Sequence, residues 1–287
     1  MKLAILGSNG RLGATLCQEW RERFEIQPIG RAQLDLAHEM AVREFARSIQ
    51  ADAVLNPAGL TSLEACEDQP GAANAINARA PELLAAGLAA RDIPLLHFST
   101  DYVFDGSKSG LYTEADTARP ISLYGRSKLA GEEAVLAASP RHWVLRVSWL
   151  FDGGRRAFPD QILEQARTQD RIEAVADKIS VPTSCRDLAD WLADLLPDLS
   201  REGGLYHACS RGRCTWQEYA QFILDAIPHP RCRQLTPIRL RDVPFFRAAR
   251  PANSAMDSAR FFRRLGRDAP DWQSALTKFL HRLTNPA

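Results

Sequence analysis

Short apolar segments alternate with amphipathic stretches through the first half of the chain. The apolar segments span residues 3–6, 25–29, 53–56, 95–99 and 143–147, and each has the length of a strand. Over residues 11–23, 39–49, 77–91 and 120–138, apolar side chains recur at helical spacing. Strands that alternate with helices are typical of a parallel sheet covered by helices on both faces. We therefore predict an α/β fold built on a Rossmann-type, doubly wound parallel sheet.

The pattern changes after Trp149, where the elements become shorter and prolines such as Pro159, Pro182 and Pro197 interrupt them. This change predicts two domains. Residues 1–150 are expected to form the dinucleotide-binding domain, and residues 151–287 mainly a smaller α/β lobe that binds substrate. Parts of the later chain are expected to return to the first domain.

Three glycines follow the first apolar segment and open the first amphipathic stretch, in the order G-S-N-G-R-L-G from Gly7 through Gly10 to Gly13. A glycine-rich turn from a strand into a helix allows the backbone to approach a pyrophosphate, and the helix N-terminus favours the anion. The motif predicts a dinucleotide site. A turn of this kind without any ligand remains the alternative, because the motif alone has low specificity.

Charge and cysteine usage exclude several classes of protein. The chain has 36 basic and 35 acidic residues, so it offers no overall field for nucleic acid or an anionic membrane. No apolar run reaches the ~18 residues of a membrane-spanning helix. We also expect no signal peptide, because the first strand begins at once and no basic stretch with a long apolar region is present. The six cysteines form no C-x-x-C pair, which argues against a structural zinc site. We expect a cytoplasmic protein with reduced thiols and no metal.

Tyr124 and Lys128 are four residues apart on a predicted helix, so their side chains lie on one face. A nearby ammonium favours the phenolate, and the phenol could then exchange a proton with a carbonyl group. Thr100 follows the fourth predicted strand, at the edge where open α/β sheets bind their ligands. These three residues predict a catalytic site. The alternative is a tyrosine ring packed on a lysine stem.

Motifs along nearly the whole chain resemble one family. They are G-S-N-G-R-L-G at 7–13, L-D-L at 34–36, N-P-A-G-L-T at 56–61, S-T-D-Y-V-F-D-G at 99–106, Y-G-R-S-K-L-A-G-E at 124–132, R-V-S-W-L-F at 146–151, V-P-T at 181–183, G-L-Y-H at 204–207 and R-P-A-N-S at 250–254. The chain is similar to the extended short-chain dehydrogenase/reductases, and within them to the dTDP-4-dehydrorhamnose reductases. This resemblance implies reduction of the C4 ketone of a dTDP-4-keto-6-deoxysugar by a nicotinamide cofactor, giving dTDP-L-rhamnose.

The resemblance also implies roles for individual residues. Tyr124 would donate the proton, Lys128 would hold the nicotinamide ribose, and Thr100 would hydrogen-bond the ketone oxygen. The cofactor would contact Gly7, Gly10, Arg11, Leu12, Gly13, Arg31, Asp35, Leu36, Ala58, Gly59, Leu60, Phe98, Tyr124 and Lys128. The sugar nucleotide would contact Thr100, Asp101, Trp149, Arg250, Asn253 and Ser254. Two alternatives are that Trp149 is a core residue and that Arg250 is an exposed loop arginine.

The end of the second strand bears on the choice of cofactor. A carboxylate there would bind the ribose 2′-hydroxyl of NADH, whereas an arginine accommodates the 2′-phosphate of NADPH. The chain has Arg31 at this place and Asp35 four residues later. We therefore expect NADPH, with NADH as the alternative.

Several residues depart from the family pattern. Leu60 stands where tyrosine or histidine is usual, Pro57 replaces a small residue, and Lys178 and Ser180 interrupt the run D-Q-x-G-x-P-T. These departures leave the identity of the sugar open. Some members bind magnesium between subunits through carboxylates, but the aligned positions here are Thr15 and Arg186. We expect no such metal site, and a homodimer is left open.

Two other functions share much of the same pattern. One is a non-catalytic, cofactor-binding regulatory subunit, which would not need the tyrosine, lysine and tryptophan that this chain retains. The other is a nucleotide-sugar epimerase or dehydratase of the same superfamily, which would normally need further acid and base residues beside Thr100 and Tyr124.

Overall fold

A computed structural model describes residues 1–199, 202–228 and 230–284. Its centre is a six-stranded sheet in the order β10-β5-β4-β3-β1-β2, in which every neighbouring pair is parallel. The strands are β1 (Lys2–Leu6), β2 (Glu25–Ile29), β3 (Ala53–Asn56), β4 (Leu95–Thr100), β5 (Trp143–Val147) and β10 (Gly204–His207). The α/β fold and the five predicted strands are confirmed. The strand order reverses between β1 and β3, which is where open sheets of this kind bind ligands.

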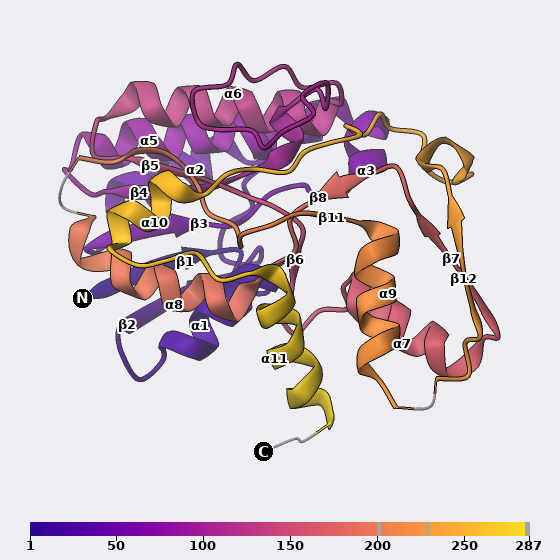
Figure 1. Cartoon of the computed structure of the whole chain (residues 1–287). Coiled ribbons are helices and arrows are strands. Elements are labelled where there is room, and N and C mark those ends of the chain that lie inside the picture. The colour runs from indigo at the N-terminus through magenta and orange to yellow at the C-terminus, as the bar shows by residue number, and fades with distance from the viewer. Residues whose placement is uncertain (200–201, 229, 285–287) are drawn as a thin grey trace.

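Helices cover both faces of the sheet (Figure 1). One face carries α1 (Arg11–Trp20), α8 (Cys185–Leu195) and α10 (Ala259–Leu265). The other carries α2 (Glu39–Ser48), α5 (Ala80–Ala89) and α6 (Leu123–Ala138). Alternate residues of β1 supply the two cores, because Leu3 and Ile5 pack on the first face and Ala4 and Leu6 on the second.

Local chemistry explains where the structure and the predicted helices differ. The helix predicted over 120–138 begins at Leu123, because the Ser122 hydroxyl accepts a hydrogen bond from Gly125 N (3.1 Å) and caps it. In place of one helix over 77–91, the chain forms a longer helical region with several segments. These are α3 (Leu63–Asp68), α4 (Pro70–Asn74), a π-helical turn (Ala75–Arg79) and then α5.

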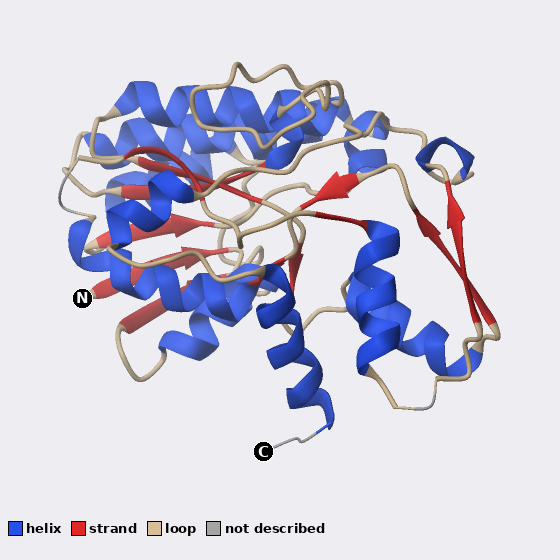
Figure 2. Cartoon of the chain, in the orientation of Figure 1, coloured by secondary structure: helices blue, strands red, loops and turns tan. Residues whose placement is uncertain are grey.

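The later chain contributes to both parts of the molecule. Strand β10 extends the central sheet and α8 packs on α1, so these two later elements lie with the central sheet. Away from the sheet lie α7 (Phe158–Thr168), β7 (Arg171–Val175), α9 (Trp216–Ala226), β12 (Gln234–Ile238) and α11 (Trp272–Thr284). These elements enclose a separate apolar core and form the smaller lobe (Figures 1 and 2).

Short strand pairs connect the two parts. They are β6 (Leu150–Phe151) with β9 (Thr183–Ser184), and β8 (Ile179–Ser180) with β11 (Cys214–Thr215). None of the helices in the described part of the chain has the length and apolarity needed to cross a bilayer.

Candidate active site

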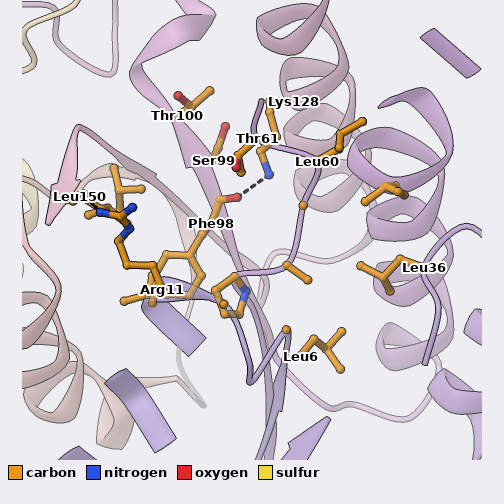
Figure 3. Close-up of a pocket in the computed structure, with 18 of the residues that line it drawn as sticks. Leu6, Arg11, Leu36, Leu60, Thr61, Phe98, Ser99, Thr100, Lys128 and Leu150 are labelled. Atoms are coloured by element: carbon orange, nitrogen blue, oxygen red, sulfur yellow. Dashed lines mark hydrogen bonds between the residues drawn. The ribbon is translucent and has the colours of Figure 1, made fainter. Parts of the chain in front are cut away.

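A cavity of about 630 Å³ lies at the carboxyl ends of β1, β2, β3, β4 and β5. This volume is within the range of ~300–1,000 Å³ that is common for small-molecule sites. Every residue predicted to bind the cofactor lines the cavity except Gly13. Thr100, Asp101 and Trp149 line it as well, whereas Arg250, Asn253 and Ser254 do not. Figure 3 shows Arg11, Phe98 and Lys128 around this space.

The glycine turn fits a ligand that must approach the backbone closely. Gly7 has a φ of +62°, which favours glycine, and Gly10 N donates to Gly7 O over 2.8 Å. A Cβ on Gly13 would lie 2.3 Å from Gly7 O, so Gly13 supports the turn from behind. No side chain caps the N-terminus of α1, which leaves its first N–H groups free to bind an anion.

Arg11 connects the turn to the segment that follows β5. Its guanidinium donates to Leu150 O (2.9 Å) and to Arg156 O (2.8 Å), and Figure 3 shows Arg11 beside Leu150. Arg155, on the same segment, lines the cavity and adds a cation near the turn. Sequence reasoning missed Arg155, because it lies in a loop with no motif.

Arg31 and Asp35 lie together at the end of the cavity formed by β2. The Arg31 side chain is 81% exposed, and its Nη2 is 3.2 Å from Asp35 Oδ2. A hydrogen bond from Ala37 N and the contact with Arg31 hold the pKa of Asp35 below its usual value. Asp35 is therefore ionised at neutral pH and pairs with Arg31.

Thr100, Tyr124 and Lys128 meet at the end of β4, and all three side chains are buried. Burial raises the pKa of the Tyr124 phenol above the ordinary value for tyrosine, and Thr100 acts on the phenol in the opposite direction. Lys128 Nζ donates to Phe98 O over 2.6 Å and lies 3.3 Å from His97 Nε2. Burial lowers the pKa of Lys128 to about 8. Because its pKa is raised, Tyr124 is present as the phenol at neutral pH, and the phenol is the form that can donate a proton.

One expectation about this pair differs from the structure. The sequence favoured a tyrosine pKa lowered by Lys128, but burial raises the pKa of Tyr124, and the group that opposes burial is Thr100, not Lys128. The ammonium of Lys128 is directed at Phe98 and His97. His97 is completely buried and its Nδ1 lies 3.2 Å from Asn56 Nδ2, so a histidine that the sequence did not single out helps to hold the lysine.

Asp101 and Trp149 form another part of the cavity wall. Asp101 is buried, and its carboxylate accepts hydrogen bonds from Thr100 Oγ1 (3.2 Å) and Ser148 Oγ (3.0 Å). Trp149 has a φ of +43° and packs against the rings of Phe158, Trp216 and Tyr219 in the smaller lobe. Trp149 is thus both a core residue and a wall of the cavity.

The three late residues predicted to contact substrate make internal contacts instead of lining the cavity. The side chain of Arg250 is only 6% exposed, pairs with Glu64 (2.8 Å) and stacks on Phe246, so it is not an exposed loop arginine. Asn253 Nδ2 donates to Lys108 O and Gly110 O. The hydroxyl of Ser254 donates to Asp101. These residues hold the loops behind the cavity.

A side chain from the π-helical turn holds the loop after β3. Asn77 Oδ1 accepts from Leu60 N (2.8 Å) and its Nδ2 donates to Leu60 O (2.9 Å), so the amide fixes the backbone of that loop. Leu60 itself lines the cavity. Sequence reasoning did not identify Asn77, because its partner is 17 residues away.

Thr15 and Arg186, the two positions considered for a metal site, make contacts with other protein groups. Thr15 donates to Arg11 O, and Arg186 pairs with Glu19. Over the residues that the structure describes, no group of three His, Cys, Asp or Glu side chains is placed to hold a metal ion.

Known proteins match almost the whole length of the chain. Residues 1–285 match the family model of the RmlD substrate binding domain. The chain is 33% identical over 295 residues to a dTDP-4-dehydrorhamnose reductase of Sinorhizobium fredii, an alignment that covers 99% of this chain and 98% of that protein. It is 36% identical over 284 residues to a Streptomyces antibioticus protein named as a probable dTDP-4,6-dihydroxy-2-methyloxan-3-one 4-ketoreductase, with coverage of 96% and 93%.

A solved structure shares the whole architecture. The dTDP-4-dehydrorhamnose reductase of Bacillus anthracis, in complex with NADP, superposes with a TM-score of 0.90 at 28% identity and covers 98% of this chain and 99% of its own. From its full-length match to the family model and its relatives, the chain belongs to the RmlD substrate binding domain family.

Proposed function

We propose that this protein uses NADPH to reduce the C4 ketone of a dTDP-4-keto-6-deoxysugar. The observation that carries the proposal is that Tyr124, Thr100 and Lys128 meet in the same cavity as the glycine turn. A proton donor and a dinucleotide site that share one cavity are what a ketone reduction needs. The names of the relatives support the same reaction class.

The residues present fit a bound nicotinamide dinucleotide. A side chain on Gly7 would clash with Ala58, so the backbone of the turn stays bare at this position. The bare backbone of Gly7 and Gly10 and the uncapped N–H groups at the start of α1 would hold the pyrophosphate. Lys128 would hold the nicotinamide ribose. When bound, the reduced cofactor supplies the hydride that reaches the ketone carbon.

The protein supplies the proton for the ketone oxygen. Tyr124 is the donor, since burial keeps it as the phenol until the reduced oxygen accepts its proton. The resemblance implied that Thr100 bonds the ketone oxygen, but here its hydroxyl donates to Asp101. We infer that Thr100 orients the Tyr124 phenol.

Arg31 supports the choice of NADPH. Its guanidinium lies at the cavity, is largely exposed, and offers a forked set of donors for a phosphate. Asp35 is already paired with Arg31, so it does not repel a 2′-phosphate as a free carboxylate would. NADP in the Bacillus anthracis structure supports the same choice.

The smaller lobe is proposed to bind the sugar nucleotide. Trp149 and Asp101 offer an apolar ring and an acceptor to a sugar, while Arg250 holds the adjacent loop. Because the two reductase relatives are named for different dTDP sugars and Leu60 lines the cavity, the proposal specifies the class of sugar and not one member of it.

The test is a substrate panel. Loss of NADPH absorbance is followed with dTDP-4-keto-6-deoxyglucose, its C3/C5 epimer and a UDP-linked 4-keto sugar. We expect net NADPH oxidation with at least one dTDP substrate and much less with the UDP sugar. A regulatory subunit would bind NADPH without turnover. An epimerase or dehydratase would change the sugar with no net oxidation of the cofactor, and either result would contradict the proposal.

A further inference from the structure

Lys178 is a completely buried cation close to the reacting centre. It lies in the turn before β8, and its side chain is 0% exposed. Its Nζ has three acceptors: Ser254 Oγ at 2.6 Å, Ser180 Oγ at 2.9 Å and Ile179 O at 3.2 Å. Three acceptors match the three N–H groups of an ammonium, whereas a neutral amine has only two. The geometry therefore fits the charged form.

Hydrogen bonds connect this cation to the catalytic threonine. Ser254 Oγ accepts from Lys178 and donates to Asp101 Oδ2 over 2.5 Å. The other oxygen of Asp101 accepts from Thr100 Oγ1, and Thr100 lies in the same cavity as Tyr124 and acts on its pKa. The path from Lys178 to the proton donor thus runs through Ser254, Asp101 and Thr100.

Lys178 and Ser180 both depart from the D-Q-x-G-x-P-T run that is usual among proteins resembling this chain. In the structure the two residues touch, because Ser180 Oγ accepts from Lys178 Nζ. Ser180 Oγ also lies 3.1 Å from Ser254 Oγ. Lys178 and Ser180 therefore form one contact. Lys178 replaces the glutamine of the motif, and Ser180 supplies one of the oxygens that accept from the Lys178 ammonium.

We propose that Lys178 is a positioning residue for the reduction, and that its ammonium acts through Ser254 to keep the Asp101 carboxylate ionised. This inference rests on the proposed function. An ionised Asp101 can only accept, so Thr100 must donate to it. The Thr100 oxygen is then left to face the Tyr124 phenol and orients it until the ketone oxygen accepts the proton. A protonated Asp101 could reverse these hydrogen bonds.

The groups around Asp101 assign this role to Lys178. Burial raises the pKa of Asp101, and the charge of Lys178 opposes it, together with hydrogen bonds from Ser254, Ser148 and Thr100. Tyr102, Tyr124 and Cys209 also face Asp101, but burial raises their pKa values and they stay neutral. Arg250 lies nearby and is paired with Glu64. Lys178 is thus the cation that lowers the pKa of Asp101.

The decisive experiment measures the pKa of Asp101 directly. Carboxyl ¹³C shifts are titrated in the full chain and in Lys178→Gln, with Asp101→Asn used to assign the signal. We expect the pKa of Asp101 to rise by about one unit in Lys178→Gln, because an opposite charge has been removed. Ser180→Gly, which keeps the lysine, is the matched control and should shift it much less. An equal pKa in the full chain and Lys178→Gln overturns the inference.

Kinetics then test whether this charge matters to the reaction. The acid limb of kcat/KM should move to higher pH in Lys178→Gln and in Lys178→Gln/Ser180→Gly, because Asp101 takes up its proton at higher pH. NADPH affinity, measured by fluorescence, should not change, which also shows that the variants fold. An acid limb that stays in place despite a shifted Asp101 pKa refutes the positioning role. A full chain without reductase activity refutes the proposed function instead, and the ¹³C titration still decides the charge coupling.

Discussion

At the scale of single residues, the proposed reaction depends on the protonation states of Tyr124 and Lys128. Burial raises the pKa of Tyr124 and lowers that of Lys128 to about 8, so both effects reduce charge in the cavity. The phenol can donate its proton, and the lysine is mostly an ammonium at neutral pH. The proposed function therefore assigns the acid role to Tyr124, while Lys128 keeps its ammonium on Phe98 O and His97.

Replacing Tyr124 with Phe removes the acid and keeps the ring. Since general acid catalysis contributes about 10²–10⁴-fold, kcat should fall by about that factor. The dissociation constant for NADPH, from fluorescence titration, should change little. Leu136→Ala, on the same helix, is a control outside the cavity and should retain most turnover. Turnover by Tyr124→Phe at the rate of the full chain would show that another group donates the proton.

Arg31 bears on cofactor choice. Arg31→Ala should weaken NADPH binding by about tenfold, because hydrogen bonds to charged groups contribute ~1.5–3 kcal/mol, while NADH binding should hardly change. Isothermal titration with both cofactors measures the difference. Arg21→Ala, an exposed arginine on the far end of α1, is the control and should affect neither. Equal losses for NADPH and NADH would contradict a contact with the 2′-phosphate.

At the scale of elements, the turn from β1 into α1 is the most tightly constrained part of the site. A methyl group on Gly13 would meet the Gly7 carbonyl oxygen at 2.3 Å, and backbone cannot easily move away. Gly13→Ala should therefore distort the turn, cost ~1–3 kcal/mol of stability and weaken NADPH binding. Thermal unfolding and fluorescence titration measure both effects.

Gly71→Ala offers a matched control for this change. Gly71 lies in α4, and a Cβ there would meet nothing within 4 Å. The same substitution should leave stability and cofactor binding nearly unchanged. If Gly13→Ala behaved like Gly71→Ala, close packing behind the turn would not be what shapes the site.

The sequence predicted elements well where one periodicity dominates. Five of the six strands of the central sheet were predicted, because each is a short run rich in apolar residues and bounded by turn residues. The division of residues 63–89 into several helical segments was not predicted, and neither were the hydrogen bonds by which Asn77, in the π-helical turn, reaches back to Leu60. Strand β10 was also missed. Its four residues resemble a loop until they are paired with β5.

For the site, too, features that depend on short spacings in the sequence were predictable, and contacts between distant residues were not. Gly7, Tyr124 and Lys128 were predicted because their chemistry depends on short spacings along the chain. Arg155 and His97 were not, because only the folded chain brings them to the cavity or to Lys128. Lys178 was visible as a departure from a motif, but its contact with Ser254 joins residues 76 positions apart.

At the scale of the whole molecule, one buried ion pair joins several elements of the central domain. Arg146 on β5 pairs with Glu132 on α6 (2.7 Å), and their side chains are 4% and 2% exposed. Glu132 also accepts from Ser99 on β4, and Arg146 lies 3.5 Å from His207 on β10. The pair therefore connects α6 with three adjacent strands.

Breaking this pair should destabilise the whole fold. Arg146→Met leaves Glu132 buried without its partner, and we expect the free energy of unfolding to fall by ~3–5 kcal/mol. Urea unfolding measures this loss. The double variant Glu132→Leu/Arg146→Met should lose less than Arg146→Met alone, because no charge is left unpaired. A loss below about 1 kcal/mol in the single variant would show that water or another group replaces the arginine.

The most direct test of the account follows the hydride itself. The protein is given a dTDP-4-keto-6-deoxysugar and NADPH deuterated at the transferable position of the nicotinamide, and the product is analysed by NMR. We predict one deuterium at C4 of the sugar for each NADPH oxidised, and about 10²–10⁴-fold slower transfer with Tyr124→Phe. A product with deuterium at another carbon, or a converted sugar with no deuterium, would contradict the assignment of this cavity to reduction of the C4 ketone.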